Sequence, residues 1–306
     1  MSWILRAPFV FSGSVIWSAV NAVVRRRAAR GRVRLPVRVI SVGNIQAGGA
    51  GKTPVVAFIA REALARGMKV CILTRGYGGA WEKRGGVLRP EDAAPEPSVC
   101  GDEPALLHEL APGAWIAVGA DRAAAFQKVS GLEKFDLAIL DDGFQHWRLE
   151  RDLDIVLVTG ARPWQRLHRE CRCALRHAGL VCFTKDAAPL KNFQSVRVSF
   201  SLPPVERKRI WLVSGVADAA HVAKTAVQAG YVVEREICSG DHARYSREEV
   251  LHISGAAASR GCRVAVTGKD WVKWRALGVK HGDVEVLEPV VEIAEGRDAW
   301  NQKLWA

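Results

Sequence analysis

Residues 41–58 read SVGNIQAGGAGKTPVVAF and decide the fold. A β-branched run at 37–42 leads into this stretch, and its middle carries the residues of a phosphate-binding loop: Gly48, Gly49, Ala50, Gly51, Lys52 and Thr53. Glycines let a backbone curl until its N–H groups point at phosphate oxygens, and the N-terminus of a following helix adds positive potential. Gln46 stands where the standard G-x-x-x-x-G-K-[ST] pattern has glycine. The compact G-G-x-G-K-T form keeps the glycines nearest the phosphate, so the stretch predicts a nucleotide site.

The segment after the loop predicts a helix. In TPVVAFIAREALARG, residues 53–67, apolar side chains recur at helical spacing, and Pro54 falls in the first turn, where its missing N–H costs nothing. Gly67 ends the pattern. We expect Lys52 to reach the terminal phosphates of ATP and Thr53 to bind Mg²⁺. The alternative, a tight strand-to-helix turn, needs neither residue.

Short apolar runs alternate with helix-like segments along the rest of the chain. The runs lie at 69–73, 115–118, 137–140, 154–158 and 180–183. This alternation is typical of a mostly parallel sheet with helices on its faces, and it predicts an α/β fold of the P-loop NTPase type. A second series of strand and helix patterns, starting near residue 210, predicts a smaller α/β lobe. The expected division is a membrane-associated segment at 1–34, a kinase core at 35–184, a linker at 185–208 and a C-terminal lobe at 209–306.

The positive charge of the chain is concentrated near its N-terminus. The net charge is +12, and residues 1–34 hold seven arginines and no acidic residue. Residues 7–24 are uncharged and largely apolar, and the basic run RRRAARGRVR follows at once. That order favours contact with a membrane on its positive, cytoplasmic side. We therefore expect a peripheral or monotopic helix at the cytoplasmic face of the bacterial inner membrane.

Other interpretations of this segment stay open. An 18-residue helix spans about 27 Å, which is marginal against a hydrocarbon core of about 30 Å, and its serines dilute the hydrophobicity. An interfacial helix is therefore favoured over a full span. A cleaved signal peptide and a helix buried against the protein's own core are the alternatives. Nucleic acid is not expected as a partner, because no interleaving of basic and aromatic residues recurs downstream.

The cysteines bear on the compartment. Seven of them are scattered along the chain, an odd number without a C-x-x-C pair. This usage fits neither a disulfide framework nor a zinc ribbon, and it indicates a reducing, cytosolic environment.

Paired carboxylates supply the second chemical signal. FDLAILDDGFQH, residues 135–146, is an apolar strand that ends in Asp141 and Asp142. P-loop proteins place a Mg²⁺-binding carboxylate at such a strand end, and because neighbouring side chains on a strand point in opposite directions, only one is expected to face the metal. An ordinary strand followed by an Asp-Gly turn is the alternative.

Two further acidic stretches are CGDEPALL at 100–107 and SGDHARYS at 239–246. Taken alone, Asp102 is typical of a helix N-cap, Asp241 of a turn, and His242 of a surface histidine. They gain meaning only in combination with the phosphate-binding loop.

That combination resembles a known family. SVGNIQAGGAGKTPVV, LTRGYGG (73–79), GDEPALL, DDGFQH followed by RDLDIVLV, GDH, and VTGKDWVKW (266–274) occur in the order and spacing of the lipid A 4′-kinases, the tetraacyldisaccharide 4′-kinases of Gram-negative bacteria. The resemblance covers residues 37 to about 290. It implies ATP-dependent, Mg²⁺-assisted transfer of the γ-phosphate to the 4′-hydroxyl of an acylated glucosamine disaccharide 1-phosphate.

The resemblance also implies roles for individual residues. Asp102, with His242, would activate the attacking hydroxyl, and an Asp-His pair suits that task because the carboxylate orients the imidazole. The expected assignments are catalytic Asp102, His242 and Asp141; phosphate-binding Gly48, Gly49, Ala50, Gly51, Lys52 and Thr53; metal-binding Thr53, Glu103 and Asp142; and substrate-binding His146, Arg169 and Glu170.

The sequence departs from the family pattern at two places. Residues 164–170 read WQRLHRE where the family has P-A-G-P-L-R-E, so only Arg169 and Glu170 match, and Gly268 replaces the glutamate of T-E-K-D. These departures affect the expected acceptor site more than the nucleotide site. The alternative functions are a soluble P-loop kinase or ligase for another small acceptor, and a degenerate nucleotide-binding protein with little catalysis.

Overall fold

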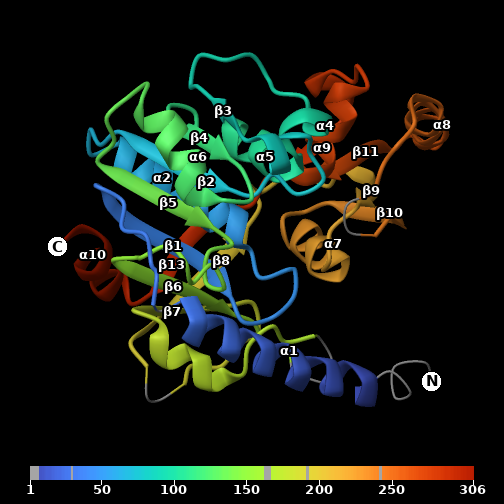
Figure 1. The fold of residues 1–306 in the computed structure, drawn as a ribbon. Coiled ribbons are helices and arrows are strands. Elements are labelled where there is room, and N and C mark those ends of the chain that lie inside the picture. The colour runs from blue at the N-terminus through green and yellow to red at the C-terminus, as the bar shows by residue number, and fades with distance from the viewer. Residues whose placement is uncertain (1–6, 29, 162–166, 191–192, 241–242) are drawn as a thin grey trace.

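Two β-sheets organise the chain in the computed structural model, which describes residues 7–28, 30–161, 167–190, 193–240 and 243–306 (Figure 1). Within these residues the larger sheet has nine strands, in the order β13 (Val290–Glu295), β8 (Ser195–Ser201), β7 (Leu180–Thr184), β6 (Leu153–Val158), β1 (Arg38–Asn44), β5 (Leu137–Asp141), β2 (Val70–Thr74), β4 (Trp115–Val118) and β3 (Gly86–Leu88). The strands from β8 to β4 run parallel, whereas the edge strands β3 and β13 are antiparallel to their neighbours.

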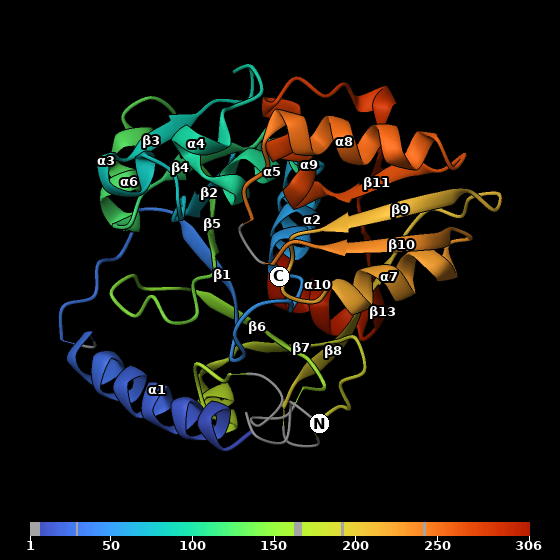
Figure 2. The ribbon, with the colours of Figure 1, turned by 90° about the vertical axis from the view of Figure 1, so that its right-hand side faces the viewer.

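The smaller sheet lies beside the larger one (Figure 2). In the described part of the chain it has four parallel strands, in the order β10 (Val232–Cys238), β9 (Arg209–Ser214), β11 (Arg263–Thr267) and β12 (Glu285–Leu287). We call residues 209–288 the second lobe and the rest of the described chain after residue 30 the core lobe. The predicted α/β fold, with a mostly parallel sheet and flanking helices, is confirmed.

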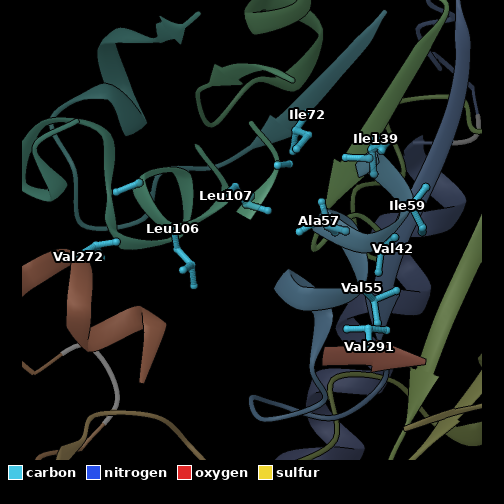
Figure 3. Close-up of a cluster of buried hydrophobic side chains, with 14 of the residues drawn as sticks. Val42, Val55, Ala57, Ile59, Ile72, Leu106, Leu107, Ile139, Val272 and Val291 are labelled. Atoms are coloured by element: carbon cyan, nitrogen blue, oxygen red, sulfur yellow. The ribbon is translucent and has the colours of Figure 1, made fainter. Parts of the chain in front are cut away.

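The helices cover both faces of the sheets. They are α1 (Ala7–Ala28), α2 (Lys52–Leu64), α3 (Trp81–Arg84), α4 (Pro97–Cys100), α5 (Asp102–Leu110), α6 (Arg122–Ser130), α7 (Ala219–Gln228), α8 (Arg247–Ala258), α9 (Gly268–Ala276) and α10 (Arg297–Trp305), with 3₁₀ turns η1 (Arg172–His177) and η2 (His281–Asp283). In β1, Val42 packs in the cluster that includes Val55 of α2 (Figure 3), whereas Val39 packs with Phe126 of α6. Alternation along a central strand therefore buries both faces of the larger sheet.

The lobe boundaries differ from the predicted ones. The stretch predicted as a linker, 185–208, contains β8, which pairs with β7 inside the larger sheet. After the second lobe the chain returns to the core lobe, because β13 pairs with β8 and α10 packs on both strands. Both strands alternate between apolar and polar residues and are partly exposed, which explains why their apolar pattern was too weak to place them in the larger sheet.

Helix α1 lies at the margin of the molecule, away from α8 (Figures 1 and 2). Its Ser14 and Asn21 are buried, while its large apolar side chains are exposed: Val15, Ile16, Trp17, Val20, Val23 and Val24. This is the reverse of the arrangement in a surface helix of a globular protein. Among the described residues, no helix has the length and apolar content needed to cross a bilayer.

The cysteines form one local bridge. Cys171 and Cys173 are joined by a disulfide, and the five other cysteines are free. A bridge between residues two positions apart does not tie distant segments of the chain together.

Candidate active site

The loop between β1 and α2 has the conformation of a phosphate-binding loop. Gly48, Gly49 and Gly51 have left-handed backbones, with φ of 69°, 62° and 83°. Such angles are costly for residues other than glycine. At Gly51 a Cβ would also lie 2.3 Å from the ring of Phe200, a residue of β8. The loop therefore needs its glycines, and α2 begins directly after it at Lys52.

Gln46 has a structural explanation. It is fully buried, and its Nε2 donates to the carbonyl oxygens of Thr159 and Ala161 at 3.0 and 2.9 Å. Its Oε1 accepts from the backbone N–H of Thr159 at 3.0 Å. These three hydrogen bonds fix the start of the loop to the end of β6, which a glycine at this position has no side chain to do. The departure from the standard pattern thus stabilises the loop.

Asp142 lies where the loop and the end of β5 meet. Its Oδ1 is 3.5 Å from Lys52 Nζ, and its Oδ2 accepts a hydrogen bond from Arg169 Nη1 at 2.7 Å. Burial acts to raise the pKa of Asp142, but the two cations outweigh it and lower the pKa to about 2. Its φ of 50° is a left-handed conformation that is unusual for aspartate and concentrates at functional sites. Asp142 is therefore an ionised carboxylate held in a defined place.

Asp141 has the opposite electrostatics. It is buried, and Thr74 Oγ1 donates a hydrogen bond to its Oδ2 at 3.1 Å. Burial, together with the negative charges of Glu103 and Asp142, raises the pKa of Asp141 to about 7. Neighbouring carboxylates on one strand end thus differ widely in proton affinity, a pattern typical of active sites.

Two cavities meet at this point. The first, which we call the loop cavity, has a volume of about 520 Å³ and is lined by residues 47–54 and by the second lobe. The other, which we call the helix cavity, has a volume of about 720 Å³ and reaches Trp17 and Asn21 of α1. Three residues line both cavities: Glu103, Asp142 and Arg169. Groups bound in the two cavities would therefore face each other across a shared set of charged side chains.

The second lobe closes the loop cavity. A Cβ on Gly48 would lie 2.7 Å from the Cβ of Ala217, so the second lobe touches the loop itself. Lys185, at the end of β7, forms an ion pair with Asp218 of the second lobe, and both line the cavity. Gly268, where the family has glutamate, also lines it.

The helix cavity carries charges of both signs, with Glu103, Asp141 and Asp142 on one part of its lining and three arginines on another. Arg75, Arg122 and Arg169 line it together with His146. Burial, followed by the positive charges of Arg122 and Arg151, lowers the pKa of His146 to about 4, so the imidazole is neutral near pH 7. Arg122 is buried, and its Nε has no hydrogen-bond partner among the described residues. A buried guanidinium with an unused donor suits an anionic ligand such as a phosphate group.

Helix α1 holds the segment that carries Arg169. Asn21 Nδ2 donates to the carbonyl of Arg169 at 2.8 Å, and Arg25 Nη1 lies 3.6 Å from Glu170 Oε2. Glu170 is buried, and it is absent from the described linings of both cavities. The structure therefore brings His146 and Arg169 together in the helix cavity and places Glu170 against α1.

Asp102 and Glu103 form the first turn of α5 and face two lysines of α9. Lys273 Nζ is 3.9 Å from Asp102 Oδ2, and Lys269 Nζ is 3.9 Å from Glu103 Oε1. Glu103 lines both cavities, whereas Asp102 is absent from their described linings. His242, the expected partner of Asp102, lies outside the described residues.

Oxygen donors suited to Mg²⁺ gather around the loop cavity. Thr53, Glu103 and Asp142 line it, and Oδ1 of Asp142 is buried without a hydrogen-bond partner among the described residues. No group of three or more His, Cys, Asp or Glu side chains in the described chain is placed to hold a metal by itself. Mg²⁺ is usually held by one or two carboxylates plus phosphate oxygens and water, so this donor set fits the ion when a nucleotide is bound.

Some residues of the site were not predicted. Arg122 is not part of a recognisable sequence motif. Its role in the site is indicated only by its position beside His146 in the lining of the helix cavity. Lys269 and Lys273 were visible in GKDWVKW, four residues apart, but the position of their carboxylate partners depends on how the second lobe folds back on α5. The spacing itself was the available signal, since residues four apart share one face of a helix.

The fold and the site define a P-loop phosphotransferase, with a nucleotide-binding loop, paired carboxylates and a second cavity opposite them. The chain belongs to the tetraacyldisaccharide-1-P 4′-kinase family, whose model matches residues 3–305. The resemblance identified from the sequence motifs is thereby confirmed.

Individual relatives agree with the family assignment. The chain is 34% identical over 302 residues to the tetraacyldisaccharide 4′-kinase of Pelobacter propionicus, covering 89% of this chain and 83% of that protein. It is 36% identical over 289 residues to that of Geobacter sulfurreducens, covering 83% and 81%. Among solved structures, the "apo" form of LpxK from Aquifex aeolicus in complex with ATP matches with a TM-score of 0.74 and 26% identity, covering 99% of this chain and 98% of that one.

Proposed function

We propose that the protein transfers the γ-phosphate of ATP to the 4′-hydroxyl of an acylated glucosamine disaccharide 1-phosphate, a step of lipid A biosynthesis. The observation that carries this proposal is the meeting of the two cavities at Glu103, Asp142 and Arg169. ATP in the loop cavity would direct its terminal phosphate toward that shared wall. The acceptor hydroxyl would approach from the helix cavity, as transfer between two bound groups requires.

On the nucleotide side, the chain supplies positioning and positive charge. Backbone N–H groups of the glycine loop would hold phosphate oxygens, and Lys52 would neutralise the terminal phosphates. Mg²⁺, when bound by Thr53, Asp142 and Glu103, would neutralise further charge on the phosphates. Asp141, whose pKa is raised by burial, can accept or release a proton near neutral pH beside this group.

On the acceptor side, the arginines of the helix cavity offer donors to an anionic sugar. Arg122 and Arg75 are suited to bind the 1-phosphate. The neutral His146 can accept a hydrogen bond from a sugar hydroxyl or donate one to it. Asp102 would act as the base toward the 4′-hydroxyl together with His242. Hydrogen bonds of this kind often tighten only when the substrate binds, so the position of Asp102 outside the cavity linings is compatible with that role.

The lipid nature of the acceptor agrees with α1. Its outward face exposes Ile16 by 66% and Val20 by 55% of their surface, while its Trp17 lines the helix cavity. Arg26 and Arg27 follow at its C-terminal end and are exposed. Such a helix is suited to lie in the headgroup region of an anionic membrane surface. We propose that α1 docks on the cytoplasmic face of the inner membrane and brings the helix cavity to the lipid.

The direct test of the kinase activity uses the purified full chain with ATP, Mg²⁺ and the acylated disaccharide 1-phosphate. The expected result is a product with a second phosphate on the 4′-oxygen. Asp102→Ala is the matched variant, expected to abolish transfer while ATP binding, measured by calorimetry, is largely retained. ATP binding by the wild-type protein without product would contradict the proposal and favour a degenerate nucleotide-binding protein.

Membrane docking has a separate test. Deletion of residues 1–34 would also remove Asn21 and Arg25, which hold the Arg169 segment, so point substitutions are cleaner. Ile16→Glu combined with Val20→Glu is expected to shift the protein from anionic vesicles to the supernatant in a sedimentation assay. Leu251→Glu, at a side chain 62% exposed on α8, is the control and should bind vesicles as the wild type does. Equal binding by all three proteins would contradict docking through α1.

A further inference from the structure

The contact between α5 and α9 joins the two lobes beside the proposed base. Leu106 of α5 and Val272 of α9 belong to one buried cluster (Figure 3). At the end of α5 nearest the cavities, Asp102 and Glu103 meet Lys273 and Lys269. Two acidic residues of the core lobe are thus matched by two lysines of the second lobe.

Lys273 is fixed by a buried carboxylate on its own helix. Asp270 is fully buried, and Lys273 Nζ lies 3.0 Å from its Oδ1. Asp270 also accepts hydrogen bonds from Gly215 N at 2.8 Å, Tyr245 Oη at 3.0 Å and Thr267 Oγ1 at 2.7 Å. A buried carboxylate is stable only when it is hydrogen-bonded and paired, so this network holds the ammonium group of Lys273 in place.

Lys273 reaches two further groups from that fixed point. Its Nζ donates to the carbonyl of Ala243 at 3.0 Å and lies 3.9 Å from Asp102 Oδ2. The side chain is 11% exposed, so solvent screens these contacts weakly. Ala243 follows His242 directly in the chain. One ammonium group therefore links α9, the segment that begins at Ala243, and the first turn of α5.

We propose that Lys273 is a positioning residue for the phosphoryl transfer, which sets the place of Asp102 relative to the second lobe. Its role rests on the proposed function, in which Asp102 meets the acceptor hydroxyl. Asp270 holds Lys273 at 3.0 Å, and Lys273 in turn orients the Asp102 carboxylate from 3.9 Å. Closure of the second lobe on the loop cavity and alignment of the base are thereby one event.

The test compares three variants of the full chain. Lys273→Met removes the charge and keeps the length, and it is expected to lower kcat about 100-fold, since misplacement by about 1 Å costs this much. The KM for ATP should stay within about threefold, because Lys273 is absent from the described lining of the loop cavity. Lys273→Arg keeps the charge and should recover kcat to within about tenfold of the wild type.

Arg275→Met is the matched control. Arg275 lies on the same helix and forms an ion pair with Glu109 of α5, so its loss weakens the same interface without touching Asp102. It should lower the melting temperature less than Lys273→Met, which also leaves the buried Asp270 carboxylate without its cation, and it should leave kcat within about threefold. If Lys273→Met does not fold, Lys273→Gln, which can still donate to Ala243, replaces it with the same expected loss.

Each outcome decides the inference. Full activity of Lys273→Met, or equal losses in Lys273→Met and Arg275→Met, would overturn the role of Lys273 while the proposed function stands. A fall confined to ATP binding would also overturn it. A wild-type protein that binds ATP but forms no product would overturn the proposed function and this inference with it.

Discussion

The loop cavity and the helix cavity are built in different ways. One wall of the loop cavity is a continuous stretch, 47–54, whose shape follows from backbone conformation at its glycines. The helix cavity is lined by side chains from α1, the end of β2, the start of α6, the end of β5 and Arg169. A site made by one contiguous backbone segment tolerates little local change. A site assembled from distant side chains depends instead on each anchor separately.

Asp142 belongs to both cavities, so its substitution should have the largest effect. Asp142→Asn removes the charge that pairs with Lys52 and Arg169, and kcat is expected to fall about 1000-fold, the size of loss typical for a group that stabilises the transition state. Initial rates of product formation measure it. The control is Asp186→Asn, whose side chain is 88% exposed, with kcat unchanged. A loss below tenfold for Asp142→Asn would show that the shared wall does not serve the transfer.

Gly51→Ala separates the two cavities. The left-handed backbone and the collision with Phe200 together predict a penalty of about 1–3 kcal/mol, which corresponds to a KM for ATP raised about 5-fold to 150-fold. The KM for the acceptor should change little, because Gly51 is absent from the described lining of the helix cavity. Steady-state kinetics with each substrate varied in turn gives both values.

The control for this variant isolates the effect of position. Gly67, just after α2, has a nearly equal φ of 77°. In Gly67→Ala the added Cβ would meet no atom within 4 Å. It is expected to cost stability alone. If both alanine variants raise the KM for ATP equally, the specific shape of the loop cavity is not what holds the nucleotide.

The same contrast explains what sequence could predict. The strand, loop and helix around Lys52 are local, so alternation, glycines and capping identified them, as they did most central strands. The topology of the sheets and the folding back of the second lobe bring Arg122, Trp17 and Lys273 to the site. The spacing of residues within a single segment does not encode these long-range contacts. The strands β8 and β13 were missed for a related reason, because pairing at a sheet edge leaves half of each strand polar.

Arg122→Met tests one anchor of the helix cavity. Loss of a charged hydrogen-bond donor costs about 1.5–3 kcal/mol, and we take the lower end, so the KM for the disaccharide 1-phosphate should rise about tenfold. The KM for ATP should not change. Arg148→Met, at an exposed arginine two residues after His146, is the control and should leave both constants unchanged. A raised KM for ATP instead would place Arg122 with the nucleotide.

Asp141→Asn should give the smallest effect, on stability in Mg²⁺-free buffer. Burial and neighbouring carboxylates raise the pKa of Asp141 to about 7. The folded state therefore binds more protons than the unfolded state between about pH 4 and pH 7, and stability falls as pH rises through that window. Asparagine cannot ionise but can still accept the Thr74 hydrogen bond. At pH 8.5 the variant should melt about 2–4 °C above the wild type, and at pH 4 the two should melt together. A wild type that is the more stable at pH 8.5 would mean that the ionised Asp141 is stabilised by the cations around it, and that both carboxylates of the shared wall are charged in the folded protein.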